Sequence, residues 1–158
     1  MLPEEITKLV GKSEQVKIFE VEKGAIRKFA DAIDDQNPLY WDEEYARNSR
    51  YGSIIAPPGF FGWPTQWARG DPFPSEATGD IRRALARTGY SRILDGRIEY
   101  EFFCPVRAGD TLTASSMIKD IVEREGKTGK TAFVITETTY TNQNGDLVAK
   151  VRQTSIQR

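Results

Sequence analysis

Apolar and polar residues alternate along several stretches in the last third of the chain. A two-residue period is typical of strands that bury one face. The alternating segments are residues 97–102, 112–118, 131–141 and 147–151. Asn144-Gly145, between the last two segments, is a strong signal for a tight hairpin turn. We therefore predict a run of four antiparallel strands in this part of the chain.

The first third of the chain changes from a strand period to a helix period. Residues 15–21 alternate as a strand does, and Gly24 follows as a break. The next apolar residues recur at helical spacing on one face, at Ile26, Phe29, Ala30 and Ile33. We assign this face, Ile33 included, to the core. Pro38 ends the helix, and residues 41–47 predict a short second helix with acidic residues in its first turn.

The middle of the chain predicts two further helices. Small and aromatic residues dominate positions 54–63, and we predict a buried helix from about Gly59 to Arg69, kinked at Pro64. A polar insert follows at 70–89, with a helix predicted over 75–87. Helices grouped early and strands grouped late favour an α+β fold, in which a curved antiparallel sheet is covered on one face.

Composition and length narrow the classes of protein. The 158 residues predict one domain over 1–158. The 22 basic and 23 acidic residues are spread along the chain, so no basic stripe predicts nucleic-acid binding. The N-terminus lacks the pattern of a signal peptide, and no apolar stretch approaches the ~20 residues of a membrane span. The single cysteine fits a reducing compartment, and we expect a cytoplasmic protein.

The absence of histidine is the most informative feature of the composition. Histidine is the usual general base at neutral pH and the commonest metal ligand. With no histidine and one cysteine, we expect neither a zinc site nor a Ser-His-Asp triad within this chain. We predict no metal and no cofactor.

The segment from Ala30 to Tyr40 carries the candidate chemistry. It runs from the apolar helix into the adjacent carboxylates of Asp34 and Asp35, and then into the turn of Asn37-Pro38. Two interpretations stay open for the carboxylates. They form part of a site, or they are solvated loop residues that end one helix and start the next.

This order of elements, together with three motifs, resembles the hot-dog fold of the MaoC-like hydratase/dehydratase family. The resemblance covers nearly the whole chain. Its motifs are Asp35-Gln36-Asn37-Pro38-Leu39-Tyr40, Ile55-Ala56-Pro57-Pro58, and the structural turn from Phe102 to Thr111. The resemblance implies a curved antiparallel sheet wrapped around a central helix. It also implies an activity that adds water to, or removes it from, the double bond of an enoyl thioester.

The resemblance also shows where this chain departs from the family. The family's acid position falls on Asp35, but its histidine position falls on Tyr40, whose ordinary pKa of about 10 makes it a poor base. The family's carbonyl-polarising glycine falls on Pro58, which has no N–H. Gly59 could replace it only if the loop shifts by one residue.

These losses imply a non-catalytic half of a two-part enzyme. Such a chain pairs its sheet with a catalytic MaoC-like subunit, or with itself as a dimer, and shapes the tunnel for an acyl-CoA or acyl-carrier-protein substrate. Alone it is expected to be weak or inactive. The resemblance places Asp35 and Tyr40 at the catalytic positions. It makes Asn37, Gly59, Phe60 and Trp63 candidates for substrate binding, with core packing as the alternative for the last two.

Two other functions stay open. Some hot-dog thioesterases use a lone carboxylate and need no histidine, so acyl-CoA hydrolysis is one alternative. The other is a non-enzymatic hot-dog dimer that only binds acyl thioesters. The sequence contains no thioesterase-type motif, and it does not identify the acyl chain.

Overall fold

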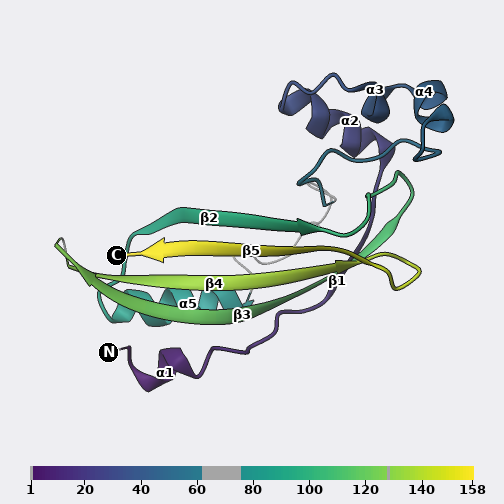
Figure 1. Cartoon of the computed structure of the whole chain (residues 1–158). Helices are drawn as coiled ribbons and strands as arrows, with labels where there is room; N and C mark the ends of the chain where they lie inside the picture. The colour runs from purple at the N-terminus through teal and green to yellow at the C-terminus, as the bar shows by residue number, and fades with distance from the viewer. Residues whose placement is uncertain (1, 62–75, 128) are drawn as a thin grey trace.

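A computed structural model describes residues 2–61, 76–127 and 129–158 of the chain (Figure 1). The helices are α1 (Glu4–Thr7), α2 (Lys23–Ala32), α3 (Pro38–Trp41), α4 (Glu43–Asn48) and α5 (Glu76–Arg87). The strands are β1 (Lys17–Glu20), β2 (Ile93–Phe102), β3 (Thr111–Gly126), β4 (Gly129–Thr141) and β5 (Leu147–Gln157). The α+β class and the late run of four strands are confirmed.

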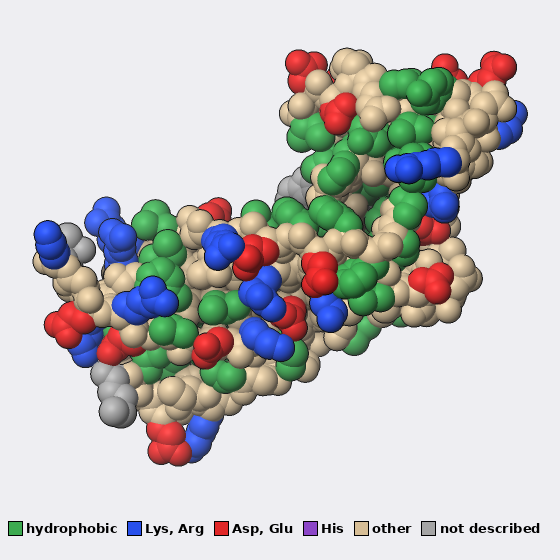
Figure 2. All heavy atoms as spheres, viewed as in Figure 1, with side chains coloured by type: hydrophobic (Ala, Val, Ile, Leu, Met, Phe, Trp, Pro, Cys, Tyr) green, Lys and Arg blue, Asp and Glu red, His purple; other side chains and the backbone are tan. Residues whose placement is uncertain are grey.

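The five strands form one antiparallel sheet in the order β1-β3-β4-β5-β2. Three consecutive strands, β3 to β5, are therefore neighbours, and β1 and β2 lie at the two edges. Helix α5 runs along one face of the sheet, and α2, α3 and α4 gather beyond one end of it (Figure 1). The face seen in Figure 2 carries acidic and basic side chains interleaved, without a large region of one sign.

Helix α5 covers one end of the sheet because its apolar stripe meets the inner faces of β3 and β4. Ile81 and Leu85 are 1% and 0% exposed and belong to a cluster with Ile118, Ile121 and Val134. The helix predicted over 75–87 is thus confirmed, and its narrow stripe is used for packing.

A second cluster joins the sheet to α2. Phe19 and Val21 enter it from β1 and the residues just after it, and Ile26 enters from α2. Ile33 does not take part, because its side chain is 49% exposed. The prediction that Ile33 belongs to the core is therefore wrong. The helix ends at Ala32, so the chain turns away before the periodic face can be extended.

The helix predicted from Gly59 to Arg69 is not present at its start. Pro58 and Gly59 form a turn and Phe61 lies in a bend, and the rest of that prediction, with Pro64, lies outside the described residues. Within the described parts of the chain, no helix is long and apolar enough to cross a membrane.

Strand β2 contains a bulge that sets the direction of its side chains. The pairing with β5 is shifted between Asp95 and Arg97, so that Gly96 is an extra residue. A Cβ on Gly96 would lie 2.8 Å from both the Thr154 carbonyl oxygen and Ile156 Cγ1. Backbone cannot yield at such a distance, so the bulge requires glycine.

Candidate functional site

The candidate segment begins where α2 ends in a left-handed residue. Asp34 has a φ of 55°, its N–H donates to the Asp31 carbonyl at 3.0 Å, and the Asp35 N–H donates to the Ala30 carbonyl at 2.9 Å. This pair of bonds is a Schellman motif, which usually places glycine where Asp34 stands. Asp34 therefore serves to end the helix, and the reversal directs the chain at Asp35 toward α3.

Asp35 and Asn37 organise the turn that follows. Asp35 Oδ1 accepts the Asn37 N–H at 3.1 Å, and Asn37 Oδ1 accepts the Leu39 N–H at 3.1 Å. Asn37 is thereby the N-cap of α3, with Pro38 in the first helical position. The Trp41 Nε1–H donates to the Asp35 carbonyl at 3.0 Å. The side chains of Asp35 and Asn37 thus both have structural roles in this turn.

Tyr40 lies beside these residues, and its side chain is 6% exposed. Burial raises the pKa of its hydroxyl, and the charges of Asp35 and Tyr51 raise the pKa further, while a hydrogen bond with the Asn37 side chain lowers it. The net direction is upward, so the phenol stays protonated at neutral pH. Tyr40 can donate a hydrogen bond there but cannot act as a base.

Gly59 lies in a tight turn that leaves its N–H free. The Phe60 N–H donates to the Pro57 carbonyl at 3.1 Å, and Gly59 has a φ of 88°. Proline second and a left-handed glycine third are typical of a type II turn. Among the described residues, no acceptor meets the Gly59 N–H. The turn therefore offers a donor one residue later than the gap-free motif match suggests.

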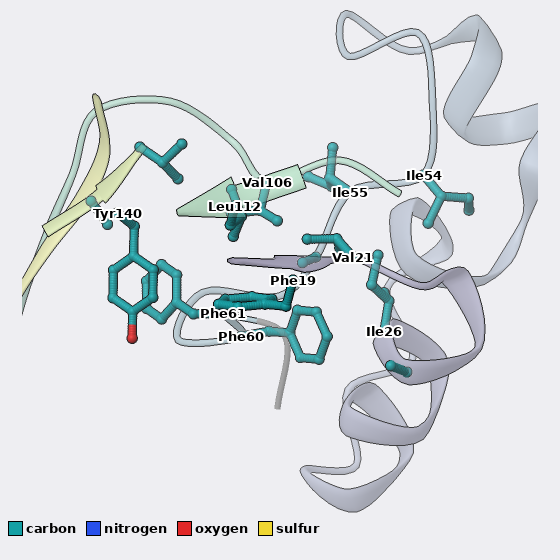
Figure 3. Packing of buried hydrophobic residues seen from close by; sticks show 14 of the residues in the cluster. Phe19, Val21, Ile26, Ile54, Ile55, Phe60, Phe61, Val106, Leu112 and Tyr140 are labelled. Carbon is teal, nitrogen blue, oxygen red and sulfur yellow. The ribbon is translucent and has the colours of Figure 1, made fainter. Parts of the chain in front are cut away.

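Phe60 connects this turn to α2. Its ring centroid lies 5.4 Å from that of Phe29, and its side chain is 1% exposed, which places it in the core (Figure 3). Trp63 lies outside the described residues. No hydrogen bond in the described chain joins Asp35 or Tyr40 to Gly59, whereas Tyr40 and Phe60 belong to the same core cluster.

The sequence analysis missed an aromatic wall beside Gly59. Tyr100 and Phe102 from β2 have ring centroids 5.7 Å apart at an interplanar angle of 10°. The Phe61 ring lies 4.4 Å from that of Tyr140 on β4, and the two rings face each other in Figure 3. In the sequence, the available signal for this wall was a pair of aromatic residues two positions apart, Tyr100 and Phe102. The pairing of β2 with β5, and of β5 with β4, was needed to bring them near Tyr140.

Arg107 and Asp110 form hydrogen bonds that hold the segment from Phe102 to Thr111 to the neighbouring loops. The Arg107 guanidinium donates to the Tyr51 carbonyl at 2.6 Å, and Asp110 Oδ2 accepts the Arg107 N–H at 2.7 Å. Gln143 donates to the other oxygen of Asp110 at 3.1 Å. These bonds satisfy a carboxylate that is only 7% exposed. The turn from Phe102 to Thr111 therefore acts as a support.

No three histidine, cysteine, aspartate or glutamate side chains come together as metal ligands would within residues 2–61, 76–127 and 129–158.

Comparison with known proteins points to one family. The sequence pattern of the family described as "FAS1-like, dehydratase domain region" matches residues 8–151. A relative called "UPF0336 protein" from Streptomyces avermitilis is 38% identical over 108 residues, which are 68% of this chain and 67% of the relative. A "Probable enoyl-CoA hydratase alpha subunit" from Thermomonospora curvata is 29% identical over 132 residues, covering 80% of this chain and 41% of the relative.

Solved structures agree on the fold. The ChsH1-ChsH2 complex from Mycobacterium tuberculosis contains a similar chain with a TM-score of 0.82 and 20% identity, covering 96% of this chain and 86% of the other. The HadBC (3R-Hydroxyacyl-ACP Dehydratase) complex from the same organism gives a TM-score of 0.68 at 25% identity, covering 94% of this chain and 96% of the other. The hot-dog fold is thereby confirmed. The chain belongs to the FAS1-like dehydratase-domain family, within the MaoC-like hot-dog proteins.

Proposed function

We propose that this chain is the non-catalytic half of an (R)-specific enoyl-CoA hydratase or 3-hydroxyacyl-thioester dehydratase. The catalytic base is then supplied by a second MaoC-like chain that carries the histidine. The family and the enoyl-CoA hydratase alpha subunit among the relatives support a hydratase or dehydratase complex. The ChsH1-ChsH2 and HadBC structures are themselves complexes of two different chains.

Tyr40 carries the proposal. Hydration of an enoyl thioester needs a base that takes a proton from water while the water oxygen attacks C3 and C2 gains a proton. Tyr40 occupies the base position, and it is buried with a pKa raised above its ordinary value. Asp35 Oδ1 accepts the Asn37 N–H, which engages this carboxylate in the turn before α3.

The open edge of β2 is the proposed surface for the partner sheet. Among residues 2–61, 76–127 and 129–158, β2 pairs only with β5, so its other side is an edge to which none of these residues pairs. Exposed apolar side chains lie along it, and Ile98 and Phe102 are each 50% exposed. The ten-residue edge contains no proline but carries four charged side chains and a bulge, so a partner strand would pair best with the regular part after Gly96. A partner strand there would extend the sheet across the two subunits.

The test compares the chain alone with the chain mixed with its partner. The partner is the histidine-bearing MaoC-like chain that co-purifies from the native source. Hydration of trans-2-octenoyl-CoA is followed by loss of the conjugated-thioester absorbance. We expect no turnover from the chain alone, and turnover from the mixture that depends on the partner's histidine.

Asp35 provides the control. Asp35→Ala in this chain should leave the turnover of the mixture within about 2-fold, because the reaction uses the partner's residues. Turnover by the purified chain alone that disappears in Asp35→Ala would place the chemistry in this chain and overturn the proposal.

A further inference from the structure

The outer face of the sheet, which faces away from α5, carries an apolar row. Val134 of β4 is buried in the cluster with α5, so the neighbouring Phe133 points to the outer face. Phe133 is paired with Val122 of β3 and with Ile156 of β5, and Ile156 is paired with Leu94 of β2. The row therefore crosses four strands. Leu94 is 50% exposed and the other three side chains are partly exposed, so the row is open to a partner.

A row of alternating charges crosses the same four strands. Glu137 of β4 is paired with Arg152 of β5, which is paired with Glu99 of β2. Lys119 of β3 donates to Glu137 at 3.2 Å, which places it on the same face. From β3 to β2 the charges are positive, negative, positive and negative. The side chains of Lys119 and Arg152 are each 50% exposed, and acidic and basic side chains are interleaved over the strands in Figure 2.

Asp120 and Arg97 lie at the two ends of a third row, between the apolar row and the charged row. Asp120 of β3 is paired with Ile135, Ile135 with Thr154, and Thr154 with Arg97 of β2. Strands are spaced about 4.8 Å apart, so three spacings separate the two charges by roughly 14 Å. Asp120 and Arg97 are therefore too far apart to form an ion pair within one chain. The Arg97 side chain is 70% exposed.

These rows are complementary to themselves under a two-fold rotation. An axis parallel to the strands, between β4 and β5, exchanges β3 with β2 and β4 with β5, because the order is β3-β4-β5-β2. Each row stays at its own height along the strands, so the apolar row meets its copy. Each charge meets an opposite charge, in the pairs Lys119 with Glu99, Glu137 with Arg152, and Asp120 with Arg97. Arg92 and Arg124, two positions beyond the apolar row, are exposed at its rim, where solvent screens like charges.

We propose that the outer face binds a second copy of this chain, with the two-fold axis parallel to the strands between β4 and β5. The two sheets then pack face to face with nearly aligned strands, as sheets commonly do, through the isologous contact that is usual in homodimers. This surface differs from the open edge of β2, and the inference does not rest on the proposed function. A catalytic partner on each β2 edge would then give an assembly of four chains.

The experiment measures dimerisation of the isolated chain by sedimentation equilibrium, at concentrations from about 1 to about 100 µM. We expect the wild-type chain to dimerise. Arg97→Glu brings two carboxylates together at both symmetric contacts with Asp120, and Asp120→Lys brings two cations together there. Each variant alone should raise the Kd of dimerisation at least about 10-fold, because like charges oppose each other twice in each dimer.

Two rescues follow from the same pairing. A chain with both Arg97→Glu and Asp120→Lys has opposite charges at both contacts again. An equal mixture of the two single variants has them as well, because each variant then meets its complement in the mixed dimer. In both cases the Kd should return to within about 3-fold of the wild-type value. The separation of the two residues within one chain leaves contact between copies as the reason for rescue. Should Asp120→Lys fail to fold, Lys119→Glu with Glu99→Lys repeats the test at the neighbouring contact.

Arg47→Glu is the matched control, because Arg47 is exposed in α4, beyond the end of the sheet. It should leave the Kd within about 2-fold of the wild-type value. A wild-type chain that stays monomeric over the whole range would overturn the inference, as would failure of both rescues. A dimer joined at the β2 edge could respond to Arg97→Glu, but a change on β3 would not restore it. Assembly with a catalytic partner at that edge is measured separately, so failure here leaves the proposed function standing.

Discussion

The Asn37 backbone N–H donates a hydrogen bond of 3.1 Å to Asp35 Oδ1, and so ties the only acid of the candidate catalytic pair to the turn that precedes α3. Asn37 Oδ1 then accepts the Leu39 N–H, and the Asn37 carbonyl accepts the Tyr40 N–H at 3.0 Å. The three residues that the family motif places in a site therefore form a small structural network in this chain.

Asn37→Ala should destabilise the protein by about 1 kcal/mol, because α3 loses its N-cap. Urea unfolding followed by tryptophan fluorescence measures the change. Gln36→Ala, at the neighbouring exposed position, should shift the free energy of unfolding by less than about 0.5 kcal/mol. Equal effects from both variants would contradict the network.

Asp34→Gly should stabilise the protein by about 0.5–1 kcal/mol. Asp34 has a φ of 55°. This left-handed conformation is sterically unfavourable for a residue with a Cβ, whereas glycine adopts it without that energetic cost. Asp34→Ala keeps the cost and loses the polar side chain, so it should destabilise. Lys28→Gly, at an exposed position within α2, should destabilise by about 1 kcal/mol. Stabilisation at both glycine positions would show that the left-handed conformation is not the cause.

The stability of the fold should decline at alkaline pH, in part through Tyr140. Burial, and then the charge of Tyr100, raise the pKa of Tyr140 to about 12. Its ordinary value is about 10. A raised pKa in the folded state means that folding favours the neutral phenol. The contribution of Tyr140 to the free energy of unfolding is therefore complete below pH 10 and is lost as pH rises toward 12.

Guanidinium unfolding at pH steps from 8 to about 11.5 tests this dependence. Tyr140→Phe cannot ionise, so its free energy of unfolding should fall by about 2 kcal/mol less than that of the wild type as pH approaches 12. Parallel curves for the two proteins would show that other groups carry the alkaline loss.

Ile98→Lys on the open edge of β2 should prevent assembly with the catalytic partner, since a charged lysine on an edge strand opposes strand addition. Ile18→Lys is the matched control, because Ile18 is 68% exposed on β1 at the opposite edge of the sheet. Analytical ultracentrifugation of the mixed chains measures assembly. Loss of the complex in both variants, or in Ile18→Lys alone, would place the interface elsewhere.

The sequence predicted the strands and α5 well, because each has a regular period and a buried face. It placed Ile33 in the core because the helical period continues to that residue, although the left-handed Asp34 ends the helix first. The motif match also could not locate the free N–H at Gly59. The position of a free N–H depends on the backbone conformation of a single turn, which a motif does not record. The contact of Tyr100 with Gly59 depends on how an edge strand lies against a distant loop, and no local pattern records it.

The bulge at Gly96 has a consequence for the chemistry of the aromatic wall. If Gly96 paired with β5 as a regular strand residue, the alternation would run unbroken from Asp95, and Glu99 and Glu101 would take the face that Tyr100 and Phe102 now occupy. The shift in pairing with β5 reverses this order. The bulge at a residue without a side chain thus decides whether this face of β2 presents two carboxylates or two aromatic rings.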